Sequence, residues 1–134
     1  MEIESQPKSK KTTESGQPVQ RKPDGILIDD DPLVRSTWEM VAKQHQKEIL
    51  VFSSPEEFKK FLKGIAQEVP LFIDSNLKGG VKGEVVAKDF FETGFKSIYL
   101  VTGYDSSRFG YLPWIKGILD KTPPGWLLGA EVES

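Results

Sequence analysis

The sequence contains no cysteine, and this absence excludes disulfides, thiolate metal sites and thiol catalysis. It also lacks an apolar run of the roughly 20 residues that span a bilayer, and residues 1–22 lack the apolar centre of a secretory signal. The formal charge is -2, from 18 basic and 20 acidic side chains, so no excess of positive charge favours nucleic-acid binding. We expect a cytoplasmic domain with no nucleic-acid partner and no membrane contact.

The 134 residues fit one domain with a polar segment in front of it. After Met1, residues 1–24 contain only Ile3 and Val19 as large apolar side chains. Such a segment cannot bury enough surface to offset the entropy lost on ordering, so we predict a flexible linker or tail. Residues 25–134 form the predicted domain.

Short apolar runs alternate with helical periodicity after residue 24. The runs predict strands at 25–28, 49–52, 71–73, 98–101 and 117–119, and the periodicity predicts helices at 32–45, 55–63 and 84–93, with a short helix inside 104–115. Asp31 before Pro32 is typical of a helix start, Ser54 to Glu57 forms a capping box, and Gly94 ends the third helix. This alternation predicts an α/β fold with a parallel sheet.

Residues at three- and four-residue spacing mark the inner face of each helix. The side chains expected to face the core are Val34, Trp38, Val41, Ala42 and His45 in the first helix, Phe58, Phe61, Leu62 and Ile65 in the second, and Val85, Val86, Ala87 and Phe90 in the third. The glycine- and lysine-rich residues 76–83 predict a flexible loop. They do not match a phosphate-binding loop, because they lack its Gly-Lys-Ser/Thr ending. His45, the single histidine, is expected to be structural.

Polar side chains follow the predicted strands where each one ends: Asp29 and Asp30, then Asp74, Thr102 and Lys121. The carboxyl ends of parallel strands meet at one edge of a sheet, so these groups should converge. Carboxylates held close together repel one another, and a divalent cation relieves that repulsion. Oxygen ligands without sulfur or imidazole favour Mg2+.

The same groups suit phosphoryl transfer. An aspartate can attack phosphorus and form an aspartyl-phosphate. Positioned cations and donors then stabilise the charge on the phosphoryl oxygens, for which Lys121 offers an ammonium and Thr102 a hydroxyl. Lys116 competes with Lys121 for this role, and we favour Lys121 because it follows the last predicted strand.

In these motifs the chain resembles the receiver domains of response regulators and hybrid histidine kinases. The resemblance covers residues 25–123, and it depends on the runs ILIDDDPLVR (26–35), LFIDSN (71–76), LVTG (100–103) and LDK (119–121). It implies a flavodoxin-like (βα)5 three-layer sandwich with a five-stranded parallel sheet in the order 2-1-3-4-5. The last helix would be short or missing, since few residues follow Lys121.

The resemblance also implies a magnesium site. Asp29 and Asp30 would form the acidic metal pocket, with Asp30 as the more direct ligand. Asp74 would be both the phosphoacceptor and a ligand, and Asn76 would contribute its backbone carbonyl. Phosphotransfer to Asp74 and its later hydrolysis would be self-modification rather than conventional turnover, although the parent chain could be a hybrid histidine kinase.

By the same resemblance Thr102 would be the switch hydroxyl and Lys121 the ion-pairing lysine, and the donor would be a histidine kinase or a histidine phosphotransfer protein. Three positions depart from the family pattern: Ile118 replaces a switch aromatic, Thr122 replaces a proline, and Lys78 stands where proline is common. A free-standing regulator and the C-terminal receiver of a hybrid kinase both suit this layout. We expect a monomer or a weak dimer.

Two other functions stay open. A phosphorylation-independent pseudo-receiver, acting as a protein-interaction module, would explain the altered lysine loop and the missing aromatic. A phosphatase of the haloacid-dehalogenase type would use Asp29 as nucleophile and Asp31 as acid/base. Such an enzyme needs a further acidic pair for magnesium, and only Glu131 and Glu133 remain after Lys121.

Overall fold

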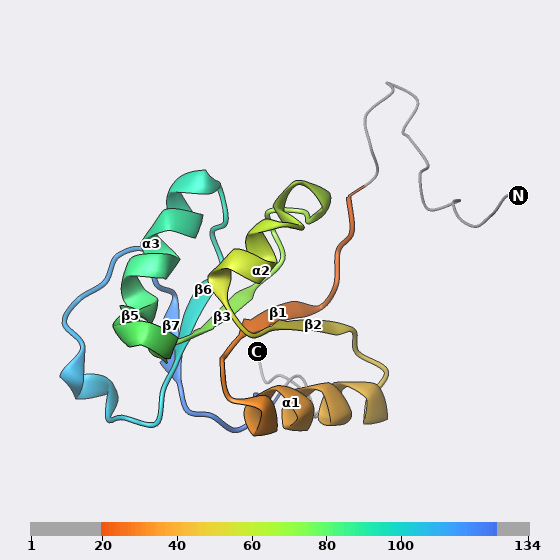
Figure 1. The fold of residues 1–134 in the computed structure, drawn as a ribbon, viewed down its shortest axis with the longest axis horizontal. Coiled ribbons are helices and arrows are strands. Elements are labelled where there is room, and N and C mark those ends of the chain that lie inside the picture. The colour runs from red at the N-terminus through yellow and green to blue at the C-terminus, as the bar shows by residue number, and fades with distance from the viewer. Residues whose placement is uncertain (1–19, 126–134) are drawn as a thin grey trace, which may run out of the picture.

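The structure is a computed structural model, and it describes residues 20–125. A parallel α/β core and three short 3-10 turns make up this part of the chain (Figure 1). The elements in chain order are β1 (Gly25–Ile28), α1 (Pro32–Gln44), β2 (Ile49–Phe52), α2 (Pro55–Lys59), η3 (Leu62–Gly64), β3 (Leu71–Asp74), β4 (Asn76–Leu77), η4 (Lys78–Gly80), β5 (Val81–Lys82), α3 (Gly83–Thr93), β6 (Ile98–Val101), η5 (Ser106–Arg108) and β7 (Gly117–Leu119). Within residues 20–125 no helix is long and apolar enough to cross a bilayer.

Five strands form the central sheet in the order β2-β1-β3-β6-β7, and all neighbours are parallel. The predicted order 2-1-3-4-5 is therefore confirmed, because β6 and β7 are the fourth and fifth strands of this sheet. The order reverses between β1 and β3, whose register pairs Ile28 with Ile73. The residues that follow these two strands must therefore lie side by side at the carboxyl edge.

Helices cover both faces of the sheet, as a three-layer sandwich requires (Figure 1). On one face, Leu27 and Phe72 pack with Trp38 and Ala42 of α1. On the other face the apolar cluster joins the sheet to α2 and α3. It contains, among others, Ile26, Ile28, Leu71, Ile73, Phe58, Val86, Ala87 and Phe90. Alternation of side chains along each strand thus divides the core between two layers.

The three predicted helix caps are confirmed. The Asp31 carboxylate accepts a hydrogen bond from the Leu33 N–H, with proline at the first helical position. Ser54 Oγ accepts from the Glu57 N–H, and the Glu57 carboxylate accepts from the backbone N–H of Ser53. Gly94 ends α3 with a φ of 132°, a conformation that glycine tolerates best.

The second helix is shorter than predicted. It ends at Lys59, and the chain continues through a 3-10 turn at η3 instead of another α-helical turn. Ile65 is still buried, but it reaches the core as extended chain that bridges to Arg21. The expectation that Phe61 faces inward is wrong, because 56% of this residue is exposed. The same expectation is wrong for His45, which is exposed at the end of α1.

Two details around α3 also differ from expectation. Val85 is 63% exposed and does not face the core, so the inner face of α3 consists of Val86, Ala87 and Phe90. The predicted loop 76–83 is a small antiparallel hairpin of β4 and β5. Gly79 and Gly80 form its turn with φ of 79° and 77°, which explains why two glycines stand there.

The helix predicted within 104–115 is absent, so the fold lacks the fourth helix of a complete (βα)5 unit. Only the 3-10 turn η5 forms in this segment, capped by the Asp105 carboxylate. Gly110 and Pro113 interrupt any longer helix. The Trp114 indole N–H instead donates to the Glu84 carbonyl at 2.9 Å and ties the segment to α3. Between β7 and residue 125 the structure contains no helix.

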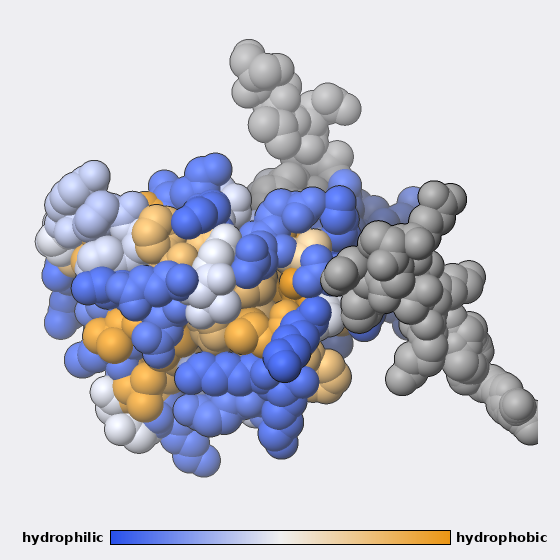
Figure 2. All heavy atoms as spheres, turned by 90° about the horizontal axis from the view of Figure 1, so that it is seen from above, coloured by the Kyte–Doolittle hydropathy of each residue, from blue (hydrophilic) through white to orange (hydrophobic). Residues whose placement is uncertain are grey.

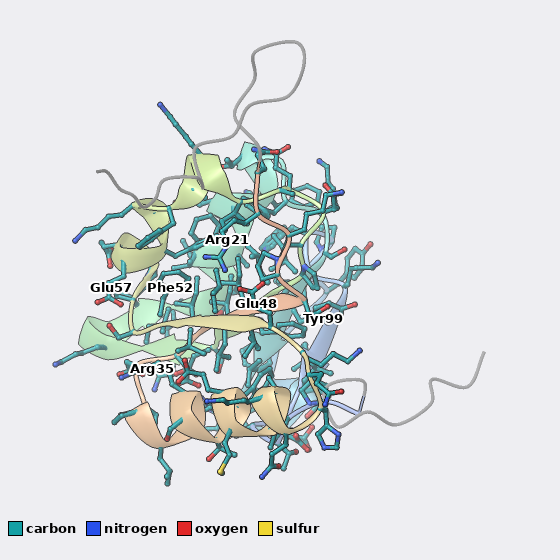
Figure 3. The ribbon with its side chains drawn as sticks, turned by 90° about the vertical axis from the view of Figure 1, so that its right-hand side faces the viewer. Arg21, Arg35, Glu48, Phe52, Glu57 and Tyr99 are labelled. Atoms are coloured by element: carbon teal, nitrogen blue, oxygen red, sulfur yellow. The ribbon has the colours of Figure 1, made fainter. Side chains whose placement is uncertain are left out.

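The predicted linker falls largely outside the described residues, which begin at Gln20. Its last residues contact the domain: the Arg21 N–H donates to the Gly64 carbonyl, and the Asp24 carboxylate accepts from the Glu48 N–H. Arg21 and Glu48 also form an exposed ion pair (Figure 3). Figure 2 shows a face on which hydrophobic residues lie among many hydrophilic ones.

Candidate functional site

Three carboxylates lie together at the carboxyl edge of the sheet. Asp29 and Asp30 directly follow β1, and Asp74 is the last residue of the neighbouring strand β3. One oxygen from each of the three carboxylates lies within 4.8 Å of the others. Asp29 is fully buried and Asp74 is 5% exposed. The topology therefore brings the three predicted acids into one cluster.

Lys121 supplies the positive charge of this cluster. Its Nζ lies 2.7 Å from Asp29 Oδ2 and 2.9 Å from Asp74 Oδ1. The side chain of Lys121 is 32% exposed, so it reaches from the surface to two buried carboxylates. The rival Lys116 is exposed and forms no ion pair with the acids. The ammonium thus lies between the predicted metal pocket and the predicted phosphoacceptor.

The carboxylate oxygens differ in how they are used. Asp29 Oδ1 accepts from the Asp31 N–H at 2.9 Å, while its Oδ2 accepts from the lysine ammonium. Asp74 Oδ1 accepts from the same ammonium and from the Asn76 N–H at 3.2 Å. Within the described part of the chain, Asp74 Oδ2 and the Asp30 carboxylate have no hydrogen-bond partner. These free oxygens are the ones that a reacting group or a cation can reach.

The electrostatic environment of the cluster shifts the pKa values of Asp74 and Lys121. Burial raises the pKa of Asp74 from 3.8 to about 6, and the Asp29 charge adds to this shift. The hydrogen bonds from Lys121 and from the Asn76 N–H act in the opposite direction. Burial lowers the pKa of Lys121, but its hydrogen bonds to Asp29 and Asp74 outweigh burial and raise that pKa overall. The ammonium is therefore firmly charged, whereas Asp74 carries a destabilised negative charge.

Thr102 follows β6 and is only 2% exposed. Its Oγ1 accepts from the Ser75 hydroxyl at 2.8 Å and from the Tyr104 N–H at 3.0 Å. With two accepted hydrogen bonds, the Thr102 hydroxyl keeps its own proton to donate elsewhere. Ser75 directly follows Asp74, so this hydroxyl pair is adjacent to the acid cluster.

Three contacts of the site were not predicted from the sequence. Ser75 bonds Thr102, the Arg35 guanidinium donates to the Asp29 carbonyl at 2.8 Å, and the Trp38 indole N–H donates to the Lys121 carbonyl at 2.9 Å. Arg35 lies one turn into α1, only six residues after Asp29, so the local sequence could have indicated its contact. The other two contacts join residues 27 and 83 positions apart, and no local sequence pattern indicates them.

A shallow cavity of about 460 Å³ opens over the cluster. Its lining residues are Asp30, Asp31, Asp74, Ser75, Asn76, Gly103, Tyr104 and Lys121. Four of the six predicted site residues therefore line one cavity, while Asp29 and Thr102 are buried beside it. The donor set consists of carboxylate and amide oxygens, which fits Mg2+ and does not fit a soft transition metal.

Neither a family model nor a curated protein sequence matches the chain, but solved structures do. A putative response regulator from Chloroflexus aurantiacus is similar with a TM-score of 0.62 and 22% identity, over 81% of this chain and 93% of that one. The chain has the receiver fold.

Two further solved structures share this receiver fold. The response regulator StyR is similar with a TM-score of 0.60 and 18% identity, over 81% of this chain. This chain spans 56% of the length of StyR. The signal receiver domain of an HD domain-containing protein from Pseudomonas fluorescens also gives a TM-score of 0.60, at 15% identity over 77% of this chain and 78% of that one. The resemblance found in the sequence motifs and the receiver fold thus agree.

Proposed function

We propose that the domain accepts a phosphoryl group on Asp74 from a phosphohistidine of a histidine kinase or a histidine phosphotransfer protein. The observation that carries the proposal is the placement of Lys121 Nζ between Asp29 and Asp74, beside the unpartnered Asp74 Oδ2. A buried nucleophile, a firmly charged ammonium and a free acid at one sheet edge are the components that transfer to aspartate requires.

In the proposed step Asp74 Oδ2 attacks the phosphorus atom, and the new P–O bond forms as the P–N bond to the donor imidazole breaks. The bonding electrons leave with the imidazole nitrogen, and Asp74 becomes an acyl phosphate. Lys121 Nζ, already 2.9 Å from Asp74 Oδ1, stabilises negative charge on a phosphoryl oxygen. The Thr102 hydroxyl has a proton to donate to another oxygen.

A magnesium ion would be held by Asp30 and Asp74, with the backbone carbonyl of Asn76, and Asp29 would complete the acidic pocket. When bound, it would neutralise charge on the phosphoryl oxygens. Asp30 is the carboxylate best available for a cation, since it has no hydrogen-bond partner in the described residues. Asp29 already uses both oxygens, which supports an indirect role.

A phosphatase with Asp29 as nucleophile is disfavoured by the same geometry. Asp29 is fully buried, and both of its oxygens accept hydrogen bonds. Asp31, the acid/base of that alternative, caps α1 through its carboxylate. Asp29 is therefore not arranged to attack a substrate, and one oxygen of Asp31 is already engaged in capping the helix.

The pseudo-receiver keeps one observation in its favour. Lys121 offsets part of the negative charge of Asp29 and Asp74 without any metal, so the cluster is partly stabilised within the protein. A domain of this kind would keep the receiver fold as a protein-binding module, with no phosphoryl group to change its surface.

One experiment separates these functions. The protein is incubated with acetyl phosphate and Mg2+ and mapped by mass spectrometry, and beryllofluoride binding is followed in parallel by 19F NMR. The expected result is an acyl phosphate on Asp74 that the Asp74→Asn variant does not form. Asp89→Asn, which changes an exposed aspartate of α3, is the matched control and should react like the wild type.

Each other result selects an alternative. An adduct on Asp29 would select the phosphatase chemistry. No response to either reagent, from a folded protein, would reject the phosphoacceptor function and select the pseudo-receiver. Transfer from a phosphorylated histidine phosphotransfer domain then tests the donor class separately, because acetyl phosphate needs no protein partner.

A further inference from the structure

Trp38 connects the core of the domain to the residue that carries the ammonium. It lies on α1, is fully buried and packs against Phe72 with ring centroids 5.5 Å apart. Its indole N–H donates to the backbone carbonyl of Lys121 at 2.9 Å, across 83 positions of sequence. An indole is a donor only, and a buried donor needs a partner, so this hydrogen bond fixes both the ring and the carbonyl.

The backbone around Lys121 has few other anchors. The strand before it, β7, has three half-buried residues and hydrogen-bonds to one neighbouring strand within the described sheet. After it, Thr122 turns back to the Asp120 carboxylate through two local hydrogen bonds. No helix follows in the described residues to hold this segment against the sheet. The Trp38 hydrogen bond therefore ties the lysine segment to the rigid core.

The side chain of Lys121 spans the distance from this anchored backbone to the carboxylates of Asp29 and Asp74. A lysine side chain loses considerable rotational freedom when it is fixed at both carboxylates, and a mobile backbone would add to that loss. Charge stabilisation in phosphoryl transfer depends on groups that are already in place before the reaction. A fixed carbonyl at Lys121 limits where its ammonium can lie.

We propose that Trp38 is a positioning residue for Lys121: its indole N–H anchors the lysine backbone and so holds the ammonium between Asp29 and Asp74. The consequence for phosphorylation rests on the proposed function, whereas the positioning itself does not. Trp38 forms no hydrogen bond with the three acids and does not line the cavity above them.

The test uses Trp38→Phe, which keeps an aromatic ring in the core and removes the donor. A second variant carries β-(3-benzothienyl)alanine at position 38, which keeps the shape of the indole and lacks the N–H. This second variant takes the place of Trp38→Phe in the test if the smaller phenylalanine ring destabilises the core. Trp114→Phe is the matched control, since it removes an equivalent indole–carbonyl hydrogen bond on the other face of the sheet.

The first measurement does not involve phosphorylation. NMR relaxation of the Lys121 Cε and hydrogen exchange of the Thr122 amide report how firmly the segment is held. Both should show more motion in the two position-38 variants than in the wild type, and no change in Trp114→Phe. Unchanged motion in folded position-38 variants would overturn the proposal.

The second measurement is the rate of phosphorylation by acetyl phosphate in a double-mutant cycle with Lys121→Gln. Trp38→Phe should slow the reaction about tenfold in the wild-type background, the scale expected when a catalytic group is misplaced by a fraction of an ångström. It should have little further effect once Lys121 is replaced. Equal slowing in both backgrounds would indicate a general structural effect and overturn the catalytic half of the proposal.

Failure of the proposed function is distinguishable from failure of this inference. If wild-type protein takes no phosphoryl group, the function is rejected, and the NMR measurement alone decides whether Trp38 positions Lys121. If wild-type protein is phosphorylated and the cycle shows no coupling, the function stands and the positioning role in it is rejected.

Discussion

Lys121 Nζ and Asp29 Oδ2 form a 2.7 Å ion pair in which the aspartate is fully buried and the lysine side chain is 32% exposed. The carboxylate therefore depends on a partner that solvent can reach. A buried charge without its partner is strongly destabilising, while a pair open on one side can exchange that partner for another cation. This asymmetry makes the pair a point where the proposed metal site and the stability of the fold are linked.

Replacing the lysine should destabilise the metal-free protein. Lys121→Met leaves the Asp29 charge buried and unpaired, and we expect the free energy of unfolding to fall by about 2–3 kcal/mol. This is below the loss for fully buried pairs because Lys121 is partly exposed. Mg2+ should restore part of the loss, since a bound cation replaces the missing charge. Urea unfolding with and without Mg2+ measures both effects.

Lys116→Met is the control for that experiment, because Lys116 is exposed and pairs with none of the acids. Its effect should stay within about 0.5 kcal/mol. An equal loss in the two variants, or a Lys121→Met protein as stable as wild type, would contradict the dependence of Asp29 on Lys121.

The Ser75–Thr102 hydroxyl pair should behave as a coupled unit. Thr102→Val leaves the buried Ser75 hydroxyl and the Tyr104 N–H without their acceptor, and we expect a loss of about 1–3 kcal/mol in unfolding free energy. Adding Ser75→Ala to this variant should cost less than Ser75→Ala alone, because the partner is already gone. The expected coupling is about 1 kcal/mol. Additive losses in a urea-unfolding cycle would show that the pair contributes no net hydrogen bond.

The stability of the metal-free protein should depend on the ionisation of Asp74. Its pKa in the folded protein is about 6, raised from 3.8 chiefly by burial. A raised pKa means that the folded state binds the proton more tightly than the unfolded chain does. The resulting stabilisation is fully present below about pH 4 and is lost as the pH rises through 6. We expect unfolding free energy to increase from pH 7 to pH 5.

Asp74→Asn should remove this pH-dependent increment, while Asp89→Asn should retain it. The rate of phosphorylation at low Mg2+ should change in the opposite direction and fall below about pH 6, because the protonated carboxyl is a poor nucleophile. A flat stability profile for the wild type between pH 5 and 7, measured by urea unfolding, would contradict the raised pKa of Asp74.

The strands and the candidate site were predictable because each depends on a local pattern. An apolar run such as Leu71 to Ile73 specifies a buried strand, and the acid after it must lie at the carboxyl edge. Parallel topology then brings Asp74 beside Asp29 without further information. Lys121 follows from the same rule applied to β7.

The missed features depend on interruptions of the helical pattern or on contacts between distant residues. Phe61 fits the helical spacing of α2, but the chain leaves the α-helix at Lys59. The segment before β7 contains enough residues for a helix, yet Gly110 and Pro113 interrupt it and Trp114 docks on α3 instead. The bond from Trp38 to Lys121 likewise exists only once the fold is complete, so no local pattern indicates it.

Gly83 should be the glycine on which the site depends most. It begins α3, and its N–H donates to the Ser75 carbonyl at 2.9 Å. A Cβ at this position would lie 2.1 Å from the Asp74 carbonyl oxygen and 2.8 Å from Ser75 Cα, both backbone atoms. A contact of 2.1 Å cannot be accommodated by rotation of a side chain, so the backbone of Asp74 itself would have to move.

We expect Gly83→Ala to lower the free energy of unfolding by about 2–3 kcal/mol, at the upper end for an overpacked site. Phosphorylation by acetyl phosphate should be slowed as well, since the shifted Asp74 would no longer meet Lys121 at 2.9 Å. Gly64→Ala is the matched control, because a Cβ there meets no atom within 4 Å. If the two alanine variants unfold at the same urea concentration, the close approach of Gly83 to Asp74 does not constrain the site.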